Sequence, residues 1–266
     1  FSTEAAGQYP YEFFNSKYFW ERIVRDEHDT PMPQLTRADT AIVLVSIRER
    51  LSDGYRYMAE STNSDSLRYF FVYSHKGKWR LRETQGLSEA VSYMPRPDND
   101  WVVYTEGMGK VFPANADRGM LLAAQYDVNV LFYDYPSIRS DYKPYKNYRF
   151  AFHSSKDAHE GFIPLLDSLH SLRLAGQMGS GKLSLFFHSM GNNVIRELAL
   201  QKKIAPYNDH VWIDNLILNA PCVPRRKHTQ WLERIRFARK TYIHYNPADG
   251  ALKWARLAGF RQILGE

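Results

Sequence analysis

Short apolar runs alternate with longer amphipathic stretches along the chain from residue 101 onward. Brief apolar runs bounded by turn residues are typical of buried strands, and apolar residues spaced three and four apart are typical of helices. The pattern predicts strands at residues 101–105, 128–133, 182–187, 215–219 and 241–245. It predicts helices at residues 114–125, 154–174, 192–201, 229–239 and 251–258, the longest capped by Ser154 and Asp157.

A hairpin is predicted before this alternation begins. Residues 68–74 and 79–83 are rich in β-forming side chains and flank a turn at 75–78. Strands that alternate with helices predict right-handed crossovers and a mostly parallel sheet with helices on both faces. The expected fold class is therefore α/β, with the hairpin supplying antiparallel strands at one edge of the sheet.

The first third of the chain has weaker patterns. Residues 39–51 are ambiguous, because the run at 42–45 favours a strand while its longer apolar continuation also fits helical spacing. We expect a helix there, and another around residues 15–26. The chain then divides into a mainly helical N-terminal extension, residues 1–66, and an α/β domain, residues 67–266.

Ser189 lies where an apolar strand meets a helix. The strand ends at Phe187, and His188-Ser189-Met190-Gly191 leads directly into the next helix. A serine on such a turn has an exposed hydroxyl, with helix N–H groups beneath it for a developing oxyanion. The segment departs from the pattern G-x-S-x-G at Phe187. We interpret Ser189 as a nucleophile and His188 as structural; an ordinary turn with an incidental serine is the alternative.

The loop that follows the strand at 101–105 is rich in glycine and reads Glu106-Gly107-Met108-Gly109-Lys110. In hydrolase sheets with a serine on this kind of turn, the corresponding loop donates a second N–H to the oxyanion. We therefore expect the backbone N–H groups of Met108 and Met190 to form an oxyanion hole. A plain glycine-rich turn is the alternative.

Five short motifs follow one another between residues 100 and 255. They are Glu106-Gly-Met-Gly109, Tyr135-Pro-Ser137, Phe187-His-Ser-Met-Gly-Asn192, Asn219-Ala-Pro-Cys-Val223 and Tyr245-Asn-Pro-Ala-Asp-Gly-Ala-Leu252. Together they resemble a family of α/β-hydrolases catalogued as a domain of unknown function and related to lipases and esterases. The resemblance implies the α/β-hydrolase fold and makes Asp134 a structural residue that holds a loop. Glu106 stands where the family usually has histidine, and Cys222 where it usually has aspartate.

A serine nucleophile needs a base, usually a histidine oriented by a carboxylate. The chain order in this fold is serine, acid, histidine, so we expect Asp249, which follows the strand at 241–245, to be the acid. A turn or helix-capping role is the alternative. No histidine follows His244. Either the protein continues beyond Glu266 and supplies one, or a histidine from elsewhere serves, with His153 the best candidate, or the protein is inactive.

Composition and charge narrow the classes of function. The net charge of +6 permits attraction to anionic surfaces. The basic run near residues 225–240 is interleaved with apolar residues, which indicates a solvated helix face and no nucleic-acid partner. No apolar run approaches the roughly 18 residues that span a membrane. The histidines lack metal-ligand spacing and Cys222 is the only cysteine, so we expect no metal and no cofactor.

The location of the protein stays open. A single cysteine excludes an intrachain disulfide, which fits a reducing compartment such as the cytoplasm without excluding a secreted protein. The chain begins at Phe1, and removal of a signal peptide from a periplasmic or secreted protein is one explanation.

The sequence favours an enzyme. We expect a serine hydrolase that cleaves small-molecule carboxylic esters through an acyl-enzyme at Ser189. The segment 136–149 is long, aromatic and cationic, and is expected to form a lid or pocket wall for an amphipathic or anionic acyl substrate. The alternative is a catalytically inactive hydrolase-fold protein that binds a partner. The sequence does not indicate the oligomeric state.

Overall fold

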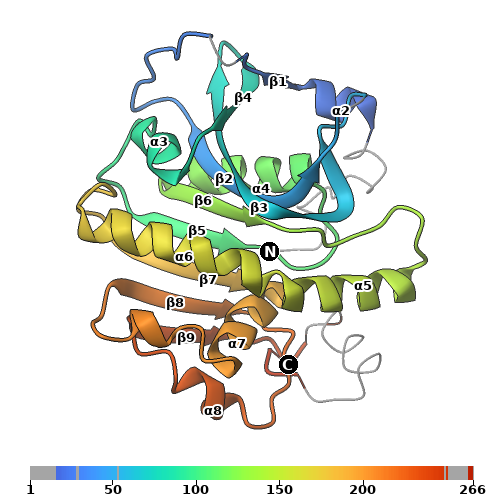
Figure 1. Ribbon diagram of the computed structural model, residues 1–266, viewed down its shortest axis with the longest axis vertical. Coiled ribbons are helices and arrows are strands. Elements are labelled where there is room, and N and C mark those ends of the chain that lie inside the picture. The colour runs from blue at the N-terminus through green and yellow to red at the C-terminus, as the bar shows by residue number, and fades with distance from the viewer. Residues whose placement is uncertain (1–15, 28–29, 53, 249, 251–262, 266) are drawn as a thin grey trace.

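A nine-stranded sheet forms the centre of the molecule, in the order β1-β4-β3-β2-β6-β5-β7-β8-β9 (Figure 1). The computed structural model describes residues 16–27, 30–52, 54–248, 250 and 263–265. The strands are β1 (Ile23–Arg25), β2 (Ala41–Arg50), β3 (Met58–His75), β4 (Lys78–Thr84), β5 (Trp101–Thr105), β6 (Asn129–Asp134), β7 (Leu183–His188), β8 (Ile213–Asn219) and β9 (Ala238–His244). The helices are α2 (Lys17–Glu21), α3 (Leu87–Ser92), α4 (Phe112–Tyr126), α5 (Pro144–Asp157), α6 (His159–Leu174), α7 (Asn192–Leu200) and α8 (His228–Leu232), with 3-10 turns η1 (Ser189–Gly191) and η2 (Ala205–Tyr207).

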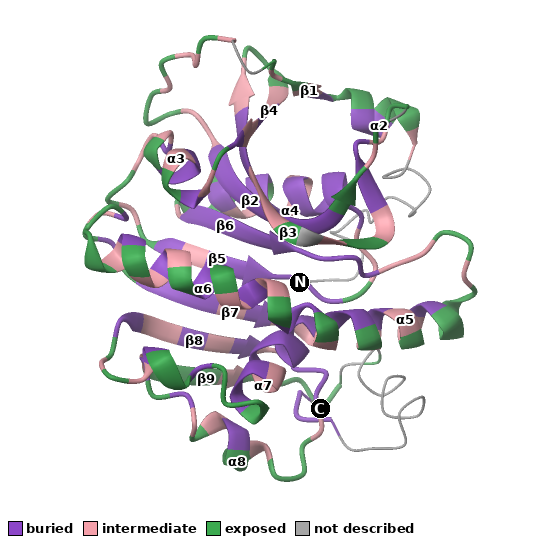
Figure 2. Cartoon of the chain, viewed as in Figure 1, coloured by how far each residue is buried: buried purple, intermediate pink, exposed green. Residues whose placement is uncertain are grey.

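In the part of the sheet with the order β2-β6-β5-β7-β8-β9 each strand is parallel to the next, and helices cover both faces of this part. Successive side chains of a strand point to opposite faces. Ile42 and Leu44 of β2 accordingly belong to the same apolar cluster as Phe112 of α4, whereas Val43 belongs to the cluster of Phe162 of α6. The inner strands are buried along most of their length (Figure 2). The predicted α/β class, with a mostly parallel sheet, is confirmed.

The predicted hairpin lies toward the edge of the sheet. β3 pairs antiparallel with both β2 and β4, and β1 is added outside β4 in parallel. The two-residue turn between β3 and β4 consists of Lys76 and Gly77, which have φ angles of +51° and +72°. Two consecutive positive φ angles match the twist of a tight hairpin, and this explains why a glycine stands in the turn.

The prediction of a helix over residues 39–51 is wrong, because Ala41–Arg50 is strand β2. Eight of its ten residues are buried, since β2 lies between β3 and β6 with helices on both faces. A strand buried on both faces loses the alternation of apolar and polar residues, and its continuous apolar run then resembles a buried helix. β3 also crosses the expected domain boundary at residues 66 and 67, so residues 41–66 contribute strands to the same sheet.

The long helix expected over residues 154–174 is two helices, α5 and α6. Helix α5 begins at Pro144, a favoured first residue because proline has no N–H and its φ is already helical. Ser154 therefore lies inside α5 and does not cap a helix. Its hydroxyl donates to the carbonyl of Pro136. The last six of the fourteen residues 136–149, the segment expected to form a lid or pocket wall, are consequently helical.

Two other helices are shorter than expected. The segment at residues 15–26 forms only the short helix α2 before β1 begins, and the segment at 229–239 forms α8, which ends at Leu232, before β9 begins at Ala238. The helix expected at 251–258 lies outside the described residues. The basic run near residues 225–240 is thus divided between a short helix and the last strand of the sheet.

A buried ion pair joins the loops at the carboxyl ends of β5 and β6. Arg48 and Asp134 have fully buried side chains, with Nε 2.9 Å from Oδ2. The carboxylate also accepts from Ser46 and Asn115. The guanidinium donates to the carbonyls of Lys110 and Tyr135 and to two carbonyls of β3. Asp134 is therefore a structural residue that holds these loops, as the resemblance implied.

Candidate functional site

Ser189 occupies the turn between strand β7 and helix α7 in a strained backbone conformation. Its φ is +51°, in the left-handed region that residues other than glycine rarely adopt, as expected for a nucleophile turn. Such a conformation costs about 1–3 kcal/mol and persists only where the surrounding structure imposes it. The side chain is partly exposed, and residues 189–191 form the 3-10 turn η1 before α7 begins.

The buried amide of Asn192 holds the turn in place. Its Nδ2 donates to the carbonyls of Phe187, at 3.0 Å, and Ser189, at 2.9 Å. The backbone N–H of Cys222, in the loop after β8, donates to the same Ser189 carbonyl at 3.1 Å. Sequence reasoning assigned no role to Asn192, although its place directly after Ser-Met-Gly is the signal that could have indicated one.

Two glycines allow the loop after β5 to lie against the serine turn. A Cβ added at Gly191 would be 2.6 Å from the carbonyl oxygen of Glu106 and 2.7 Å from that of Thr105. A Cβ added at Gly107 would be 2.8 Å from the Cβ of Ser189 and 3.2 Å from its Oγ. Both positions therefore require glycine, and the backbone of residues 106–108 lies directly beside Ser189.

The hydrogen bonds of this loop leave one of its N–H groups without a partner among the described residues. The N–H of Gly107 donates to the carboxylate of Glu106, that of Gly109 to the Ser137 carbonyl, and that of Lys110 to the Ser137 hydroxyl. Of the four N–H groups from 107 to 110, only that of Met108 donates no hydrogen bond within the described part of the chain. The N–H of Met108 is therefore the one in this loop that is left available among the described residues.

Residues 135–137 hold the same loop from the side of β6. The hydroxyl of Tyr135 donates to the carbonyl of Glu106 at 3.0 Å, and the hydroxyl of Ser137 donates to the carbonyl of Lys110 at 3.0 Å. Arg48 donates to that Lys110 carbonyl as well. The Tyr-Pro-Ser motif and Arg48 are therefore supports of the loop beside Ser189, a role that sequence reasoning did not give them.

Glu106 is a buried carboxylate beside the serine turn. Its Oε1 accepts from the N–H of Gly107 at 3.0 Å and lies 3.6 Å from Nε2 of His188, while Oε2 lies 3.7 Å from Nε of Arg118. Burial raises the pKa of Glu106, but the nearby charges of His188 and Arg118 outweigh it and hold the pKa below its ordinary value. Nδ1 of His188 is 3.0 Å from the amide nitrogen of Asn219. His188 thus joins the ends of β5 and β8, consistent with a structural role.

The expected acid and base are not brought to Ser189 within the described residues. Asp249 lies outside them. His153 lies inside α5 and is exposed, whereas Ala151, Ser154 and Ser155 of the same helix are buried. In residues 16–27, 30–52, 54–248, 250 and 263–265, no histidine hydrogen-bonds the hydroxyl of Ser189.

The segment that precedes Asp249 lies at the same edge of the sheet as Ser189. The N–H of Ala220, after β8, donates to the carbonyl of His244 at the end of β9. The N–H of Asn246 donates to the carbonyl of Gly265, whose own N–H donates to the carbonyl of Pro221. The carboxyl ends of β7, β8 and β9 therefore meet here, the edge at which parallel α/β sheets place functional groups.

The comparison with protein families agrees with this geometry. The model of the family described as "Alpha/beta hydrolase of unknown function (DUF900)" matches residues 89–264, which is most of the chain. The chain belongs to this family. No match was found among curated proteins or among solved structures.

An apolar cluster covers the turn at Ser189 in this α/β-hydrolase. Met190 packs with Ala151 of α5, Cys222 and Ile263, and Tyr148 and Phe152 of α5 pack around them. The rings of Tyr148 and Phe152 are stacked, with an interplanar angle of 12°. Helix α5, whose first residues belong to the segment 136–149 that was expected to form a lid or pocket wall, therefore supplies an apolar wall beside the turn.

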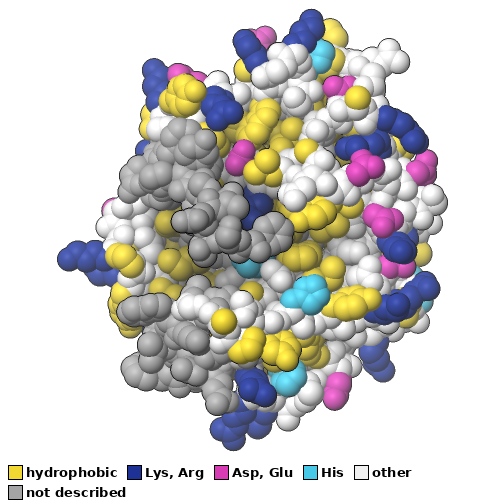
Figure 3. Space-filling view, turned by 180° about the vertical axis from the view of Figure 1, so that it is seen from behind, with side chains coloured by type: hydrophobic (Ala, Val, Ile, Leu, Met, Phe, Trp, Pro, Cys, Tyr) yellow, Lys and Arg dark blue, Asp and Glu magenta, His cyan; other side chains and the backbone are white. Residues whose placement is uncertain are grey.

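A separate half-open pocket of about 680 Å³ lies between α7 and α8 in this hydrolase fold. Ser189 is not among the residues that line it, which are Arg196, Leu200, Pro224, Arg226, Lys227, Gln230, Trp231 and Arg234. On the face seen in Figure 3, lysine and arginine side chains are spread among acidic ones and form no single basic area. Within the described residues, no helix is both long and apolar enough to cross a lipid bilayer.

Proposed function

We propose that this protein is a serine hydrolase that cleaves carboxylic esters of small molecules through an acyl-enzyme at Ser189. The observation that carries the proposal is the positive φ of Ser189 on a turn against which the glycines of the facing loop pack closely. A non-glycine residue in this conformation is most common where function requires the strain. An incidental serine on an ordinary turn would not require glycine at both 107 and 191.

The proposed reaction is an acyl transfer in two steps. The hydroxyl oxygen of Ser189 attacks the ester carbonyl while its proton passes to a base, and the oxyanion that forms accepts from the N–H groups of Met190 and Met108. Collapse of this intermediate breaks the bond to the alcohol, which leaves with the proton. Water then attacks the acyl-enzyme, and the acid product and free Ser189 are released.

The base and its acid complete the proposal. Asp249 is the proposed acid, because the segment that leads to it lies at the edge of the sheet that carries Ser189. A histidine between Asp249 and Ser189 would act as the base. His153 was the candidate from elsewhere in the chain, but its exposed position on α5 and its lack of a hydrogen bond to Ser189 within the described residues do not favour it as the base.

The apolar cluster beside the turn supports an acyl substrate. Met190, Ala151 and Cys222 are buried beside the proposed nucleophile, and the partly exposed rings of Phe152 and Tyr148 continue this apolar cluster to the surface along α5. Burial of apolar acyl carbons against such a surface is favourable by about 25 cal/mol per Å². A carboxylic ester with an apolar acyl chain therefore suits the surroundings of Ser189.

One observation favours a second function, that of an inactive hydrolase-fold protein that binds a partner or small molecule. Within the described residues the hydroxyl of Ser189 lacks an imidazole partner. Without a base, the oxyanion donors alone would leave catalysis of only about a thousandfold over water. The two functions are distinguished by whether Ser189 reacts.

Reaction with a fluorophosphonate probe tests the proposal. The probe should label the full chain once, and Ser189→Ala should abolish labelling and the hydrolysis of a short-chain aryl ester. Ser171→Ala is the matched control, because Ser171 is exposed on α6 and its hydroxyl donates within that helix. Absence of labelling in protein shown by circular dichroism to be folded would reject the enzyme and leave the binding protein.

A further inference from the structure

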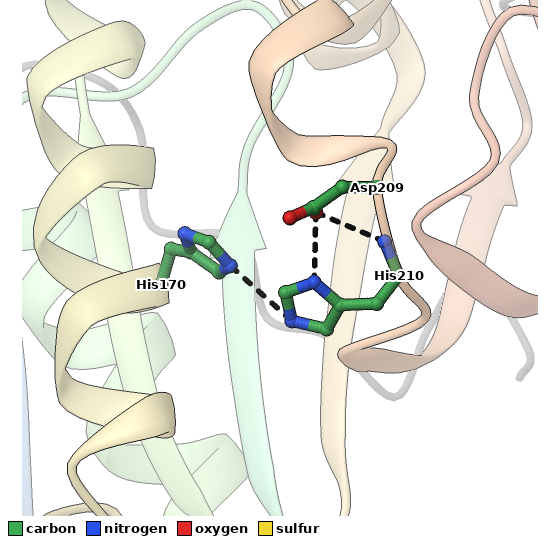
Figure 4. A group of neighbouring side chains, drawn as sticks. All are labelled: His170, Asp209 and His210. Atoms are coloured by element: carbon green, nitrogen blue, oxygen red, sulfur yellow. Dashed lines mark hydrogen bonds and ion pairs between the residues drawn. The ribbon is translucent and has the colours of Figure 1, made fainter.

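Two histidines from distant parts of the chain meet at the edge of the sheet opposite Ser189. His170 lies near the end of α6, and His210 lies in the segment that leads into β8 (Figure 4). Ser189 follows the carboxyl end of β7, whereas these residues lie where β7 and β8 begin. The Nε2 atoms of the two rings are 3.4 Å apart. The histidines therefore form a group separate from the proposed catalytic site.

We propose that His170 and His210 bind a divalent transition-metal ion, of which Zn²⁺ is the representative. In tetrahedral sites Zn²⁺ lies about 2.0–2.1 Å from each imidazole nitrogen, which places two such nitrogens about 3.3–3.4 Å apart. The observed 3.4 Å matches this separation. Water completes the coordination on the exposed side, where the side chain of His210 is 39% exposed.

Asp209 supports the proposed ligand role of His210. Its Oδ1 is 2.7 Å from Nδ1 of His210, and it also accepts from the backbone N–H of that residue (Figure 4). A ring that donates from Nδ1 keeps a lone pair on Nε2, so this contact prepares Nε2 to bind a metal ion. A carboxylate that orients a histidine ligand in this way is a regular feature of metal sites.

Aromatic packing fixes the second ligand. The ring of His170 lies 4.8 Å from that of Trp212 and 5.9 Å from that of Tyr207, measured between centroids. The hydroxyl of Tyr207 donates to Asp167 and the indole N–H of Trp212 to the carbonyl of Tyr207, so both rings are held themselves. A ligand whose ring is already oriented loses less conformational entropy when the ion binds.

The charge around the pair favours a cation. His170, Asp209 and His210 each offer one ligand atom, a ring nitrogen or a carboxylate oxygen, and these three atoms lie within 4.8 Å of one another. The ion pair that Asp209 makes in the described part of the chain is with His210, so no lysine or arginine neutralises its carboxylate there. Imidazole ligands suit Zn²⁺, Cu²⁺ and Ni²⁺, whereas Mg²⁺ and Ca²⁺ prefer oxygen.

A bound ion would connect α6 to the start of β8. Because the site lies at the opposite edge from Ser189, its expected effect is on the stability of the fold and not on acyl transfer. A ligand that binds only the folded chain raises the melting temperature as its concentration rises. The inference does not depend on the proposed hydrolase activity.

Calorimetric titration of the metal-free full chain with Zn²⁺ tests the site. One equivalent should bind saturably, and His170→Ala and His210→Ala should each abolish this binding. Asp209→Asn should weaken it about 10- to 100-fold, since it removes the residue that orients His210. The affinity should fall as the pH is lowered, because protons compete with the metal ion for the imidazole nitrogens. His228→Ala is the control and should bind as the unmodified chain does.

Trp212 gives a second measurement that is specific to the site. Cu²⁺ or Ni²⁺ bound at His170 should quench the fluorescence of the adjacent indole, and this quenching should be lost in Trp212→Phe while binding persists. If His170→Ala does not fold, His170→Gln takes its place. Absence of saturable binding, or binding by either histidine variant as tight as that of the unmodified chain, would overturn the proposal and leave a direct hydrogen bond between the two rings.

Discussion

Glu106 and His188 face each other at the carboxyl end of the sheet, with Oε1 of the carboxylate 3.6 Å from Nε2 of the imidazole. One residue precedes the glycine loop and the other precedes Ser189. The pair therefore connects the two segments that we propose to bind the oxyanion. Its charge state should affect both the stability of the fold and the position of the loop.

Replacement of Glu106 by glutamine should make the free energy of unfolding depend less on pH in the acidic range. The pKa of Glu106 is below its ordinary value of 4.5, so its ionised form stabilises the folded state above that pH. This contribution should disappear as the pH falls through the lowered pKa. Glu106→Gln should cost roughly 1–3 kcal/mol at pH 7, and the difference from the unmodified chain should shrink toward pH 3. Urea unfolding at both pH values measures it, with the exposed Glu49→Gln as control.

Alanine substitutions at Gly191 and Gly107 should have different effects, the first mainly on the stability of the fold and the second on the reaction of Ser189. Gly191→Ala would place a Cβ 2.6 Å from a backbone oxygen, and such overpacking costs about 1–3 kcal/mol. Gly107→Ala would crowd Ser189 and should reduce labelling of the serine at least tenfold. Gly86→Ala is the control, since a Cβ there meets nothing within 4 Å. Full labelling of Gly107→Ala would contradict the proposed position of the loop.

Glycine at position 189 should relieve backbone strain. Ser189 and Lys76 share a φ of +51°, but Lys76 lies in an exposed hairpin turn. The left-handed conformation costs residues other than glycine roughly 1–2 kcal/mol, which the greater chain entropy of unfolded glycine partly offsets. Both Ser189→Gly and Lys76→Gly should keep or raise the free energy of unfolding, by up to about 1 kcal/mol. Only Ser189→Gly should lose probe labelling. A large loss of stability in Ser189→Gly would show that its side chain supports the fold.

Removal of the buried guanidinium of Arg48 should destabilise the fold strongly. Arg48→Met leaves the carboxylate of Asp134 buried without its counter-charge, which costs about 3–5 kcal/mol. Arg50→Met removes an exposed pair with Glu83 and should cost less than about 1 kcal/mol. The double variant Arg48→Met with Asp134→Leu should recover part of the loss. Chemical denaturation measures all three, and equal effects of the two single variants would contradict the role of Arg48.

Variants of the proposed acid and of His153 test the catalytic assignment. Asp249→Asn should slow probe labelling by roughly a thousandfold or more, as expected for the acid of a serine, histidine and aspartate triad. His153→Ala should label within about twofold of the unmodified chain, because His153 is exposed on α5 and does not hydrogen-bond Ser189. Loss of labelling in His153→Ala would identify His153 as the base.

The sequence predicted most of the parallel sheet, because those strands are short apolar runs separated by turn residues. It also predicted the strained turn at Ser189 and the structural role of Asp134. It failed at β2, where burial on both faces removes the alternation that distinguishes a strand from a helix. It also failed to separate α5 from α6, because no proline or glycine lies between Asp157 and His159 to mark the end of a helix.

Contacts between distant parts of the chain could not be predicted from the sequence, for a different reason. His170 and His210 are 40 residues apart and lie on different elements, so their meeting has no spacing that a motif could show. The same holds for Arg48, whose partners lie in the loops after β5 and β6. Local patterns identify strands and helices, whereas these contacts depend on the order of strands in the sheet.

The place of β2 in the middle of the sheet has a consequence for biosynthesis. β2 leaves the ribosome before its neighbour β6, since Ser46 and Asp134 are 88 residues apart in the sequence. In the interval β2 pairs with β3 on one side only, and the unpaired N–H and C=O groups of its other edge can pair with strands of another chain. Long-range parallel pairing of this kind is slow and leaves nascent chains prone to aggregation. Chaperones that cover exposed strand edges should therefore raise the yield of folded protein more than changes at Ser189 do.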